Sequence, residues 1–284
     1  MLIFKKAAQL QQHIQQHKNN KEIIGFVPTM GALHQGHISL IEDSIKNCTI
    51  TVCSIFVNPT QFNDANDFEK YPVTIEQDIL LLELAKCDIL FLPSVEEMYP
   101  QGALVKTNYN IGFIETVFEG AKRPGHFNGV CQIVEKLLHI VMPNYLFLGQ
   151  KDYQQCIVIK KLVHLMHKEE VIKVIICNTS REENGLAMSS RNRRLTGNAK
   201  DNAKIIYQSF SKIKKEINKI NAVELIETAT VNILNAGFEK IDYISFANAQ
   251  TLEPISEWNG NTPLIILFAG FIDGVRLIDN MLIN

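Results

Sequence analysis

The segment VPTMGALHQGH, from Val27 to His37, decides how this chain is expected to fold. The apolar stretch Glu22–Val27 leads into it, and apolar residues at helical spacing follow in His37–Lys46. The pattern predicts a strand, a glycine-bearing turn and a helix. Such a turn lets backbone approach a ligand closely and places a helix N-terminus, which favours phosphate, beside it. His34 and His37 could then donate hydrogen bonds to phosphate oxygens, although the same corner could carry two incidental histidines.

Short apolar stretches continue to alternate with amphipathic stretches along the first half of the chain. Strands that alternate with helices of about 10 to 15 residues indicate βαβ units on a parallel sheet, whose ligand crevice lies beyond the carboxyl ends of the strands. Further strands are predicted at Thr49–Val57, Asp88–Leu92, Tyr145–Leu148 and Val171–Cys177, and further helices at Thr74–Cys87, Asn128–Val141 and Tyr153–His167.

The pattern changes after about Thr179, where helices come first and strands follow. Helical stretches at 198–219 and 222–235 precede strand-like stretches at 241–247, 264–271 and 275–278. We therefore expect an α/β protein with a parallel-sheet domain over residues 1–179 and a smaller α+β domain over residues 180–284. The polar stretch Asn58–Tyr71 is expected to be an ordered loop.

Composition excludes several classes of protein. The chain has 284 residues, 46% of them apolar, and a formal net charge of −2. A nearly neutral chain has no overall field for nucleic acid or an anionic membrane, so we expect neither as a partner. No apolar stretch approaches the length of a membrane span. The N-terminal residues are too polar for a secretory signal, and the six cysteines contain no CxxC pair, so we expect buried thiols in a cytoplasmic protein.

The segment IFVNPTQF, residues 55–62, carries amides at the end of a predicted strand. Asn58 and Gln61 both donate and accept hydrogen bonds, which suits a substrate with hydroxyl and carboxylate groups. Ordinary turn chemistry explains Asn58 and Pro59 equally well.

The segment FLGQKDYQQ, residues 147–155, again follows a strand with a glycine and then charged residues. Lys151 can neutralise a phosphate, and Asp152 can cap the following helix or bind a ribose hydroxyl. The alternative is a capped helix start with a solvated lysine.

The segment SREENGLAMSSRNRRLT, residues 180–196, is polar and basic. Ser189, Ser190 and Arg191 combine short hydroxyls with a cation, a combination suited to triphosphate oxygens. The alternative is a solvated basic linker, which is the simpler explanation for Arg193 and Arg194.

The order of these four segments resembles that of the pantothenate synthetases, or pantoate–β-alanine ligases, of the nucleotidylyl-transferase superfamily. The element His34-Gln35-Gly36-His37 is similar to the superfamily's HIGH element, and Met188-Ser189-Ser190-Arg191 resembles its mobile lysine-serine loop. The likeness covers most of the chain. It is densest in Gly25–Gly36, His37–Ile41, Ser54–Phe62, Tyr71–Pro72, Arg123–Val130, Leu148–Gln155 and Gly185–Asn192, and in RLIDNMLI near the C-terminus.

The resemblance implies a Rossmann-like N-terminal domain that binds ATP and pantoate, and it implies roles for individual residues. His37 is expected to be the catalytic histidine, supported by His34, Lys151 and Arg191. Gln61 and Gln155 are expected to bind pantoate, Gln61 also to border β-alanine, and Asp78 to help place Mg²⁺. The ATP-binding residues are expected to be Met30, Gly31, Ala32, Leu33, His34, Gln35, Gly36, His37, Gly149, Gln150, Lys151, Asp152, Ser180, Leu186, Ala187, Met188, Ser189, Ser190 and Arg191.

The implied reaction condenses (R)-pantoate with β-alanine in two steps. The pantoate carboxylate attacks the α-phosphorus of MgATP, pyrophosphate leaves, and β-alanine then displaces AMP from the pantoyl-adenylate. No protein nucleophile is needed, so orientation and electrostatic stabilisation provide the catalysis. The resemblance also implies a homodimer formed mainly through the N-terminal domain.

The sequence departs from the family pattern at a few positions. Gln150 stands where glutamate is frequent, and Thr60 stands where methionine or leucine is frequent. The stretch Cys177–Ser180 replaces a proline-containing apolar segment, which bears on the role of Ser180.

Three other functions share parts of this pattern. A transferase that loads a nucleotide onto a phosphorylated acceptor would need the first and last segments but not the amides of NPTQF and KDYQQ. A nucleotide sensor without catalysis would not need every polar residue to be present. A detached aminoacyl-tRNA synthetase core would be expected to carry a basic surface for tRNA, which the net charge does not support.

Overall fold

A computed structural model describes residues 1–62, 68–104 and 107–284 of the chain. The chain divides into two compact units. The first comprises Met1–Gly149 and Gln154–Cys177, and the second comprises Gln150–Tyr153 and Asn178–Asn284. The division along the chain falls two residues before the predicted boundary at residue 179. The second unit also includes the short segment 150–153, because backbone carbonyls of that segment bond to Asn280 near the C-terminus.

The first unit is built on a parallel sheet with the strand order β1-β4-β3-β2-β5-β6. Its strands are β1 (Leu2–Phe4), β2 (Ile24–Thr29), β3 (Ile50–Ile55), β4 (Ile89–Phe91), β5 (Tyr145–Gly149) and β6 (Lys173–Cys177). Its helices are α1 (Ala7–Asn19), α2 (Gln35–Asn47), α4 (Ile75–Leu84), α5 (Val95–Met98), α6 (Phe118–Lys122), α7 (His126–Val141) and α8 (Tyr153–Leu165), with 3₁₀ turns η1 (Pro59–Gln61) and η2 (Gly112–Thr116). This confirms the predicted Rossmann-like α/β fold.

Strand order gives this sheet a topological switch point at β2. From β2 the chain moves outward to β3 and β4, and it then returns to β5 on the other side of β2. In a parallel sheet, connections that leave in opposite directions at such a switch point open a ligand crevice beyond the strand ends. Residues 30–37 and 58–61, which come after β2 and β3, and Gly149 at the end of β5 belong to the first three candidate segments of the sequence, and parallel pairing brings these residues to one edge of the sheet.

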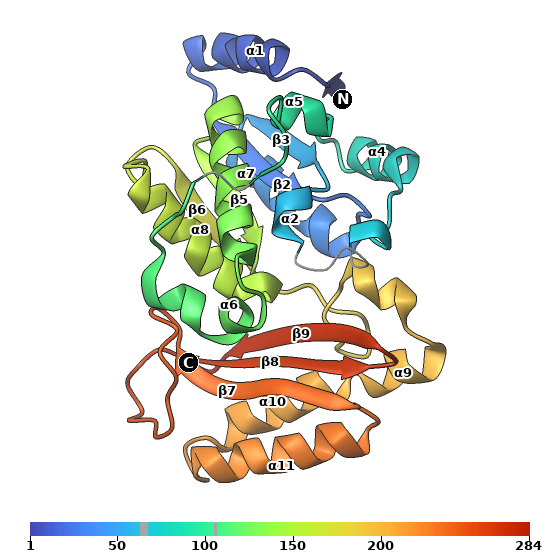
Figure 1. Ribbon diagram of the computed structural model, residues 1–284, viewed down its shortest axis with the longest axis vertical. Coiled ribbons are helices and arrows are strands. Elements are labelled where there is room, and N and C mark those ends of the chain that lie inside the picture. The colour runs from blue at the N-terminus through green and yellow to red at the C-terminus, as the bar shows by residue number, and fades with distance from the viewer. Residues whose placement is uncertain (63–67, 105–106) are drawn as a thin grey trace. The chain divides into compact units, whose positions relative to one another are not determined.

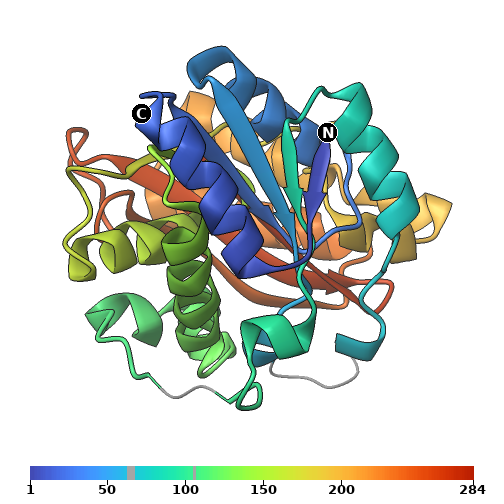
Figure 2. The same cartoon turned by 90° about the horizontal axis from the view of Figure 1, so that it is seen from above.

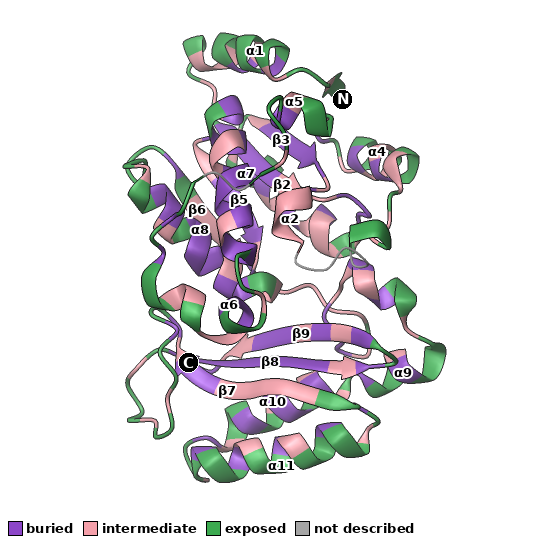
Figure 3. Ribbon diagram, viewed as in Figure 1, coloured by how far each residue is buried: buried purple, intermediate pink, exposed green. Residues whose placement is uncertain are grey.

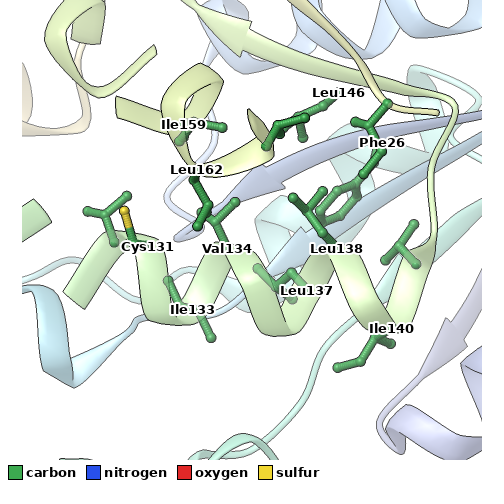
Figure 4. Close-up of a cluster of buried hydrophobic side chains, with 14 of the residues drawn as sticks. Phe26, Cys131, Ile133, Val134, Leu137, Leu138, Ile140, Leu146, Ile159 and Leu162 are labelled. Atoms are coloured by element: carbon green, nitrogen blue, oxygen red, sulfur yellow. The ribbon is translucent and has the colours of Figure 1, made fainter. Parts of the chain in front are cut away.

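Helices cover both faces of the sheet, and strand residues alternate between the two cores (Figure 2). Phe26 and Leu146 belong to the larger cluster with α1, α7 and α8 (Figure 4), whereas Val27 and Phe147 belong to a smaller cluster with α2 and α4. Burial on both faces explains why the central strands are almost continuously apolar (Figure 3). Among the described residues, no helix is long and apolar enough to cross a membrane.

The second unit places two helices against an antiparallel sheet (Figure 1). Its strands β7 (Lys240–Asn248), β8 (Leu264–Ile272) and β9 (Val275–Leu282) pair in that order, and its main helices are α10 (Ile205–Glu216) and α11 (Ala222–Asn235). The unit also contains α9 (Gly197–Asn202) and the 3₁₀ turns η3 (Gln150–Asp152) and η4 (Ser190–Arg194). This confirms the smaller α+β domain.

The structure corrects several predicted elements. β1 and α1 were not predicted, because β1 is too short for its alternation to show and α1 has only Leu10 and Ile14 fully buried. The helix predicted over 198–219 is interrupted near Ala203, which splits it into α9 and α10. The helix after β2 begins at Gln35 rather than His37. The ordered loop predicted at Asn58–Tyr71 lies partly outside the described residues.

Candidate active site

The turn after β2 ends at a helix whose first residues are capped by two histidines. His34 is the N-cap of α2, and its Nδ1 accepts a hydrogen bond from the backbone N–H of Gly36 at 3.1 Å. Nδ1 of His37 accepts in return from the backbone N–H of His34 at 3.3 Å. This reciprocal arrangement is a capping box in which imidazoles replace the usual hydroxyl and carboxylate. The predicted pair is therefore brought together, with ring centroids 4.1 Å apart.

The capping bonds select one tautomer of each ring. A ring nitrogen that accepts an N–H bond carries no proton, so a neutral His34 or His37 holds its proton on Nε2. An Nε2–H group is a donor, and a donor is what a phosphate oxygen requires. The sequence predicted the donors but not the capping bonds that orient them.

The backbone between β2 and α2 is strained and is held by a buried carboxylate. Ala32 has φ of +48°, in the left-handed region that costs a non-glycine residue about 1–3 kcal/mol. Gly31 has φ of +81°, and a Cβ there would meet Oδ2 of Asp78 at 3.0 Å. The backbone N–H groups of Ala32 and Leu33 donate to the two oxygens of Asp78 at 2.9 and 2.8 Å. Asp78 of α4 thus fixes the turn.

These contacts bear on the predicted magnesium role of Asp78. Its side chain accepts a third bond, from the hydroxyl of Thr74 at 3.1 Å, and the residue is only 1% exposed. A carboxylate has about four acceptor positions, and Asp78 uses three of them, two for the turn and one for Thr74. Within the described ranges, no group of three or more His, Cys, Asp or Glu side chains could hold a metal ion. The three hydrogen bonds that Asp78 accepts fit a residue that anchors the turn better than a residue that binds a metal ion.

The segment after β3 brings Gln61 to the same turn. Nε2 of Gln61, in η1, contacts Sδ of Met30. Asn58, by contrast, is 1% exposed, and its amide bonds the hydroxyl of Tyr99, the backbone carbonyl of Gly129 and Oε1 of Gln61. Asn58 therefore supports η1 from inside, and Gln61 is the amide of this segment that lies beside a predicted ATP-site residue.

The two neighbouring glutamines at the start of α8 have different environments. The side chain of Gln154 is buried and bonds backbone groups of Glu119, Ile114 and Val117 at 2.7–2.9 Å. Gln155 is partly exposed. The structure thus separates a structural amide from the amide that the sequence assigned to pantoate.

In the second unit, η3 carries Lys151, the lysine that the sequence assigned to the phosphates of ATP. Lys151 lies 3.7 Å from the carboxylate of Asp152, and the lysine side chain is 19% exposed. The backbone carbonyls of Gln150 and Lys151 both accept from Nδ2 of Asn280 at 2.9 Å. Sequence reasoning missed Asn280 as a contributor, although RLIDNMLI was among the segments that resemble the family.

The last candidate segment forms a short hairpin followed by η4. Arg181 and Ala187 are bridged as antiparallel neighbours, and the N–H of Met188 donates to the carbonyl of Ser180 at 3.0 Å. Ser189 caps η4 by accepting from the N–H of Arg191 at 3.3 Å. Ser190 is buried, whereas Arg191 is partly exposed. The hairpin thus leads directly into η4, whose cap and first residues are the predicted Ser189, Ser190 and Arg191.

Comparison with known proteins gives a consistent result over the whole chain. A sequence model of the family described as pantoate-beta-alanine ligase matches residues 2–282. The chain belongs to the pantoate–β-alanine ligase family. It is 45% identical to the pantothenate synthetase of Cytophaga hutchinsonii over 285 residues, which cover 100% of this chain and 99% of the relative. It is 43% identical to the enzyme of Leptospira biflexa over 282 residues, which cover 99% and 98% of the two chains.

Solved structures of family members share the fold. The crystal structure of the pantothenate synthetase of Thermus thermophilus matches with a TM-score of 0.91 at 34% identity and covers 100% of this chain and 99% of that one. The ligase of Francisella tularensis, solved in complex with β,γ-ATP and β-alanine, matches with a TM-score of 0.82 at 40% identity and covers 100% and 98%. The chain is accordingly a ligase of the pantothenate pathway, and the three other functions that share parts of the sequence pattern are set aside.

Proposed function

We propose that this ligase condenses (R)-pantoate with β-alanine through a pantoyl-adenylate and releases AMP and pyrophosphate. The observation that carries the proposal is the turn after β2. A strained backbone, fixed by a buried carboxylate, presents two oriented imidazoles at the switch point of a parallel sheet. Strained backbone residues cluster at functional sites, and ligands of open parallel sheets bind beyond the strand ends at a switch point.

The chemistry requires two anions to meet. The pantoate carboxylate must approach the α-phosphate of ATP, and negative charge grows on the phosphate oxygens as the new bond forms. In the proposal, His34 and His37 donate from Nε2 to these oxygens, and His37 is the catalytic histidine. Donors that are fixed before the reaction lower the barrier because they need no reorganisation.

Cations of the second unit complete the assignment. We assign Lys151 and Arg191 to the phosphates as catalytic cations, and Asp152 to a ribose hydroxyl. The other residues assigned to ATP lie in three places. The turn after β2 and the start of α2 contribute Met30, Gly31, Ala32, Leu33, Gln35 and Gly36. The end of β5 and the start of η3 contribute Gly149 and Gln150, and the hairpin and the start of η4 contribute Ser180, Leu186, Ala187, Met188, Ser189 and Ser190. ATP is a co-substrate in this scheme, and the Francisella tularensis relative was solved with β,γ-ATP.

The amides bind the hydroxy acid. Gln61 and Gln155 are assigned to pantoate because an amide can both donate to its carboxylate and accept from its hydroxyls. The contact between Gln61 and Met30 supports this assignment, since it places one amide beside the nucleotide turn. Gln61 is also assigned to β-alanine, which the Francisella tularensis relative carries in its complex.

The remaining proposals come from the family. Mg²⁺ is proposed to act with ATP, and it would screen the phosphate charge when bound. The contacts of Asp78 favour an anchoring role for this residue instead. A homodimer formed through the N-terminal domain and a cytoplasmic location are likewise proposed from the resemblance to the family.

The test uses the whole chain with ATP, (R)-pantoate and β-alanine, and products are identified by mass spectrometry. We expect pantothenate, AMP and pyrophosphate in equal amounts. Without β-alanine, labelled pyrophosphate should exchange into ATP only when pantoate is present, because the first step is then reversible in isolation. Stoichiometric ADP, or exchange that does not depend on pantoate, would overturn the adenylate route.

A further inference from the structure

Two adjacent residues of β9, Asp279 and Asn280, are buried polar groups to which the proposed reaction gives no role. Asp279 is 4% exposed and Asn280 is 1% exposed. Buried polar groups of this kind are costly unless they are fully paired, so their partners show what they stabilise.

Asn280 holds the 3₁₀ turn η3. Its Nδ2 donates to the backbone carbonyls of Gln150 and Lys151, both at 2.9 Å. Its Oδ1 accepts from Nε2 of Gln150 at 3.2 Å. One amide therefore fixes the backbone of the turn that carries Lys151, and it uses both its donor and its acceptor to do so.

Asp279 holds the hairpin that leads to Ser189–Arg191. Its carboxylate accepts two bonds from the guanidinium of Arg181, at 2.6 and 3.0 Å. Arg181 also donates to the carbonyl of Gly185 across the hairpin at 3.1 Å and to the carbonyl of Asn280 at 3.3 Å, and it lies over the ring of Tyr207 at 4.4 Å. A bidentate arginine–carboxylate pair with this burial is rigid as well as strong.

The side chains of Asp279 and Asn280 lie on opposite faces of the same sheet. Successive strand residues point to opposite faces. Asp279 shares its face with Phe268 and Leu277 of the helix-packed core, while the side chain of Asn280 bonds η3. The strand β9 thus fixes both η3, which carries Lys151, and the hairpin that leads to Ser189–Arg191, one from each face of the sheet.

We propose that Asp279 and Asn280 are positioning residues for the adenylation step, because they fix Lys151 and the Ser189–Arg191 turn relative to each other. The proposal rests on the proposed function of these two segments. Its physical basis is that electrostatic catalysis needs donors that are placed before charge develops, and a loosened donor is lost to the transition state. Neither residue is proposed to touch a substrate.

The test compares the two half-reactions in the full-length chain. We expect Asn280→Leu, which keeps the shape but removes the amide, and Asp279→Asn to slow pantoate-dependent pyrophosphate exchange about tenfold or more, the size of a lost buried hydrogen bond, and to raise the KM for ATP. Attack of β-alanine on preformed pantoyl-adenylate should change less than about threefold, because pyrophosphate has already left.

The matched control is Asp242→Asn. Asp242 pairs with Arg276 of β9 at 2.9 Å and with Lys240 at 3.0 Å and belongs to the same sheet, so its loss reports the cost of broken aspartate ion pairs away from η3 and the hairpin. We expect near-normal rates in both half-reactions for this variant. Asn280→Ser, which retains one donor, provides a milder variant if Asn280→Leu does not fold.

Three outcomes separate the possibilities. If the unmodified chain shows no pantoate-dependent exchange, the proposed function itself fails. If the chain exchanges but the variants lose both half-reactions in proportion, with an unchanged KM for ATP, the residues only maintain the fold and the positioning role is overturned. A selective loss in adenylation that Asp242→Asn does not reproduce supports it.

Discussion

At the scale of single residues, the capping box of α2 gives His37 two separable roles. Its Nδ1 supports the helix N-terminus, and its Nε2 is proposed to donate to the α-phosphate. We expect His37→Ala to lower kcat in pyrophosphate exchange by about 10²–10³-fold, the usual cost of one oriented donor. The lost cap should cost about 1 kcal/mol, which lowers Tm by only a few degrees in a chain of this size.

His37→Gln separates the two roles. A glutamine at the third helical position can bond back to the N-cap N–H, so it should restore Tm without restoring an imidazole donor. Loss of activity in both variants, with Tm recovered in the glutamine variant, supports catalysis by the ring. Near-normal exchange in His37→Gln would leave His37 as a cap alone.

The contacts of Asp78 lead to a second prediction. If Asp78 anchors the strained turn, Asp78→Asn replaces one acceptor oxygen with an NH₂ group that faces the N–H of Ala32 or Leu33. Activity should fall at least about tenfold, because a buried hydrogen bond to a charged group is worth about 1.5–3 kcal/mol. The Mg²⁺ concentration that gives half-maximal activity should stay the same.

A magnesium ligand would behave differently. Its loss would shift the Mg²⁺ dependence to higher concentration, and excess Mg²⁺ would restore activity. Glu76→Gln is the matched control, because Glu76 is an exposed carboxylate in the same first turn of α4. If excess Mg²⁺ restores the activity of Asp78→Asn, Asp78 acts as a magnesium ligand and not only as an anchor of the turn.

Sequence patterns led to candidate substrate-binding residues but not to the residues that support them. Motif spacing pointed to His34, His37 and Gln61 because each comes directly after a predicted strand. Asn280 is distant in sequence from the turn it supports, and two of its three bonds there go to backbone carbonyls, which leave no side-chain pattern to recognise. The anchoring bonds of Asp78 are equally invisible in sequence, since they depend on α4 lying next to the turn.

At the scale of helices and strands, the close approach of α7 to η1 positions Gln61. A Cβ on Gly129 would lie 2.1 Å from the backbone oxygen of Thr60, so only glycine allows this distance. Nδ1 of His126, in the first turn of α7, also bonds the carbonyl of Gln61 at 2.7 Å. The helix and the turn are therefore in direct backbone contact.

We expect Gly129→Ala to raise the KM for pantoate several-fold and to lower Tm. The gain in helix propensity of about 1 kcal/mol should be outweighed by overpacking of about 1–3 kcal/mol against backbone that cannot rotate away. Gly197→Ala at the start of α9 is the control, because nothing lies within 4 Å of the added methyl group. Thermal unfolding and substrate titrations would measure both effects, and an unchanged KM for pantoate in Gly129→Ala would contradict the link.

Strands buried on both faces were predictable because parallel strands need continuous apolar stretches, and the long amphipathic helices were predictable from their period. The short edge strand β1 was not, since its three residues owe their conformation to pairing with β4. The interruption between α9 and α10 was missed for a similar reason. Both flanking segments are helical by composition, and only packing in the second unit decides where one stops.

At the scale of the whole molecule, the order of strands explains how segments from distant parts of the sequence meet. Residues 30–37 follow β2, residues 58–61 come after β3, and Gly149 ends β5; these three strands are neighbours in the sheet. Parallel pairing alone brings these ends to one edge, so the candidate site of the first unit follows from topology and not from local sequence. Strand ends are therefore the feature of the sequence from which this candidate site can be predicted.

The proposed homodimer is the prediction that belongs to this scale. The first unit exposes large apolar side chains on α4, where Leu80 is 57% exposed and Leu84 is 71% exposed, and these residues share a face at i and i+4. Apolar groups concentrated on a surface favour a protein partner. We expect sedimentation of the unmodified chain at micromolar concentration to give twice its mass of 32.2 kDa.

A charge placed on this face should then weaken the dimer, because an unpaired carboxylate in an apolar contact loses its hydration. We expect Leu84→Asp to sediment as a monomer. Val231→Asp, at a 55% exposed position on α11 of the second unit, should remain a dimer and controls for the added charge. A mass near 32.2 kDa for the unmodified chain would contradict the dimer itself. A Leu84→Asp variant that stays dimeric would show that the subunit contact does not use this face of α4. Dissociation of Val231→Asp alone would indicate that the subunits contact each other through the second unit and not through the N-terminal domain.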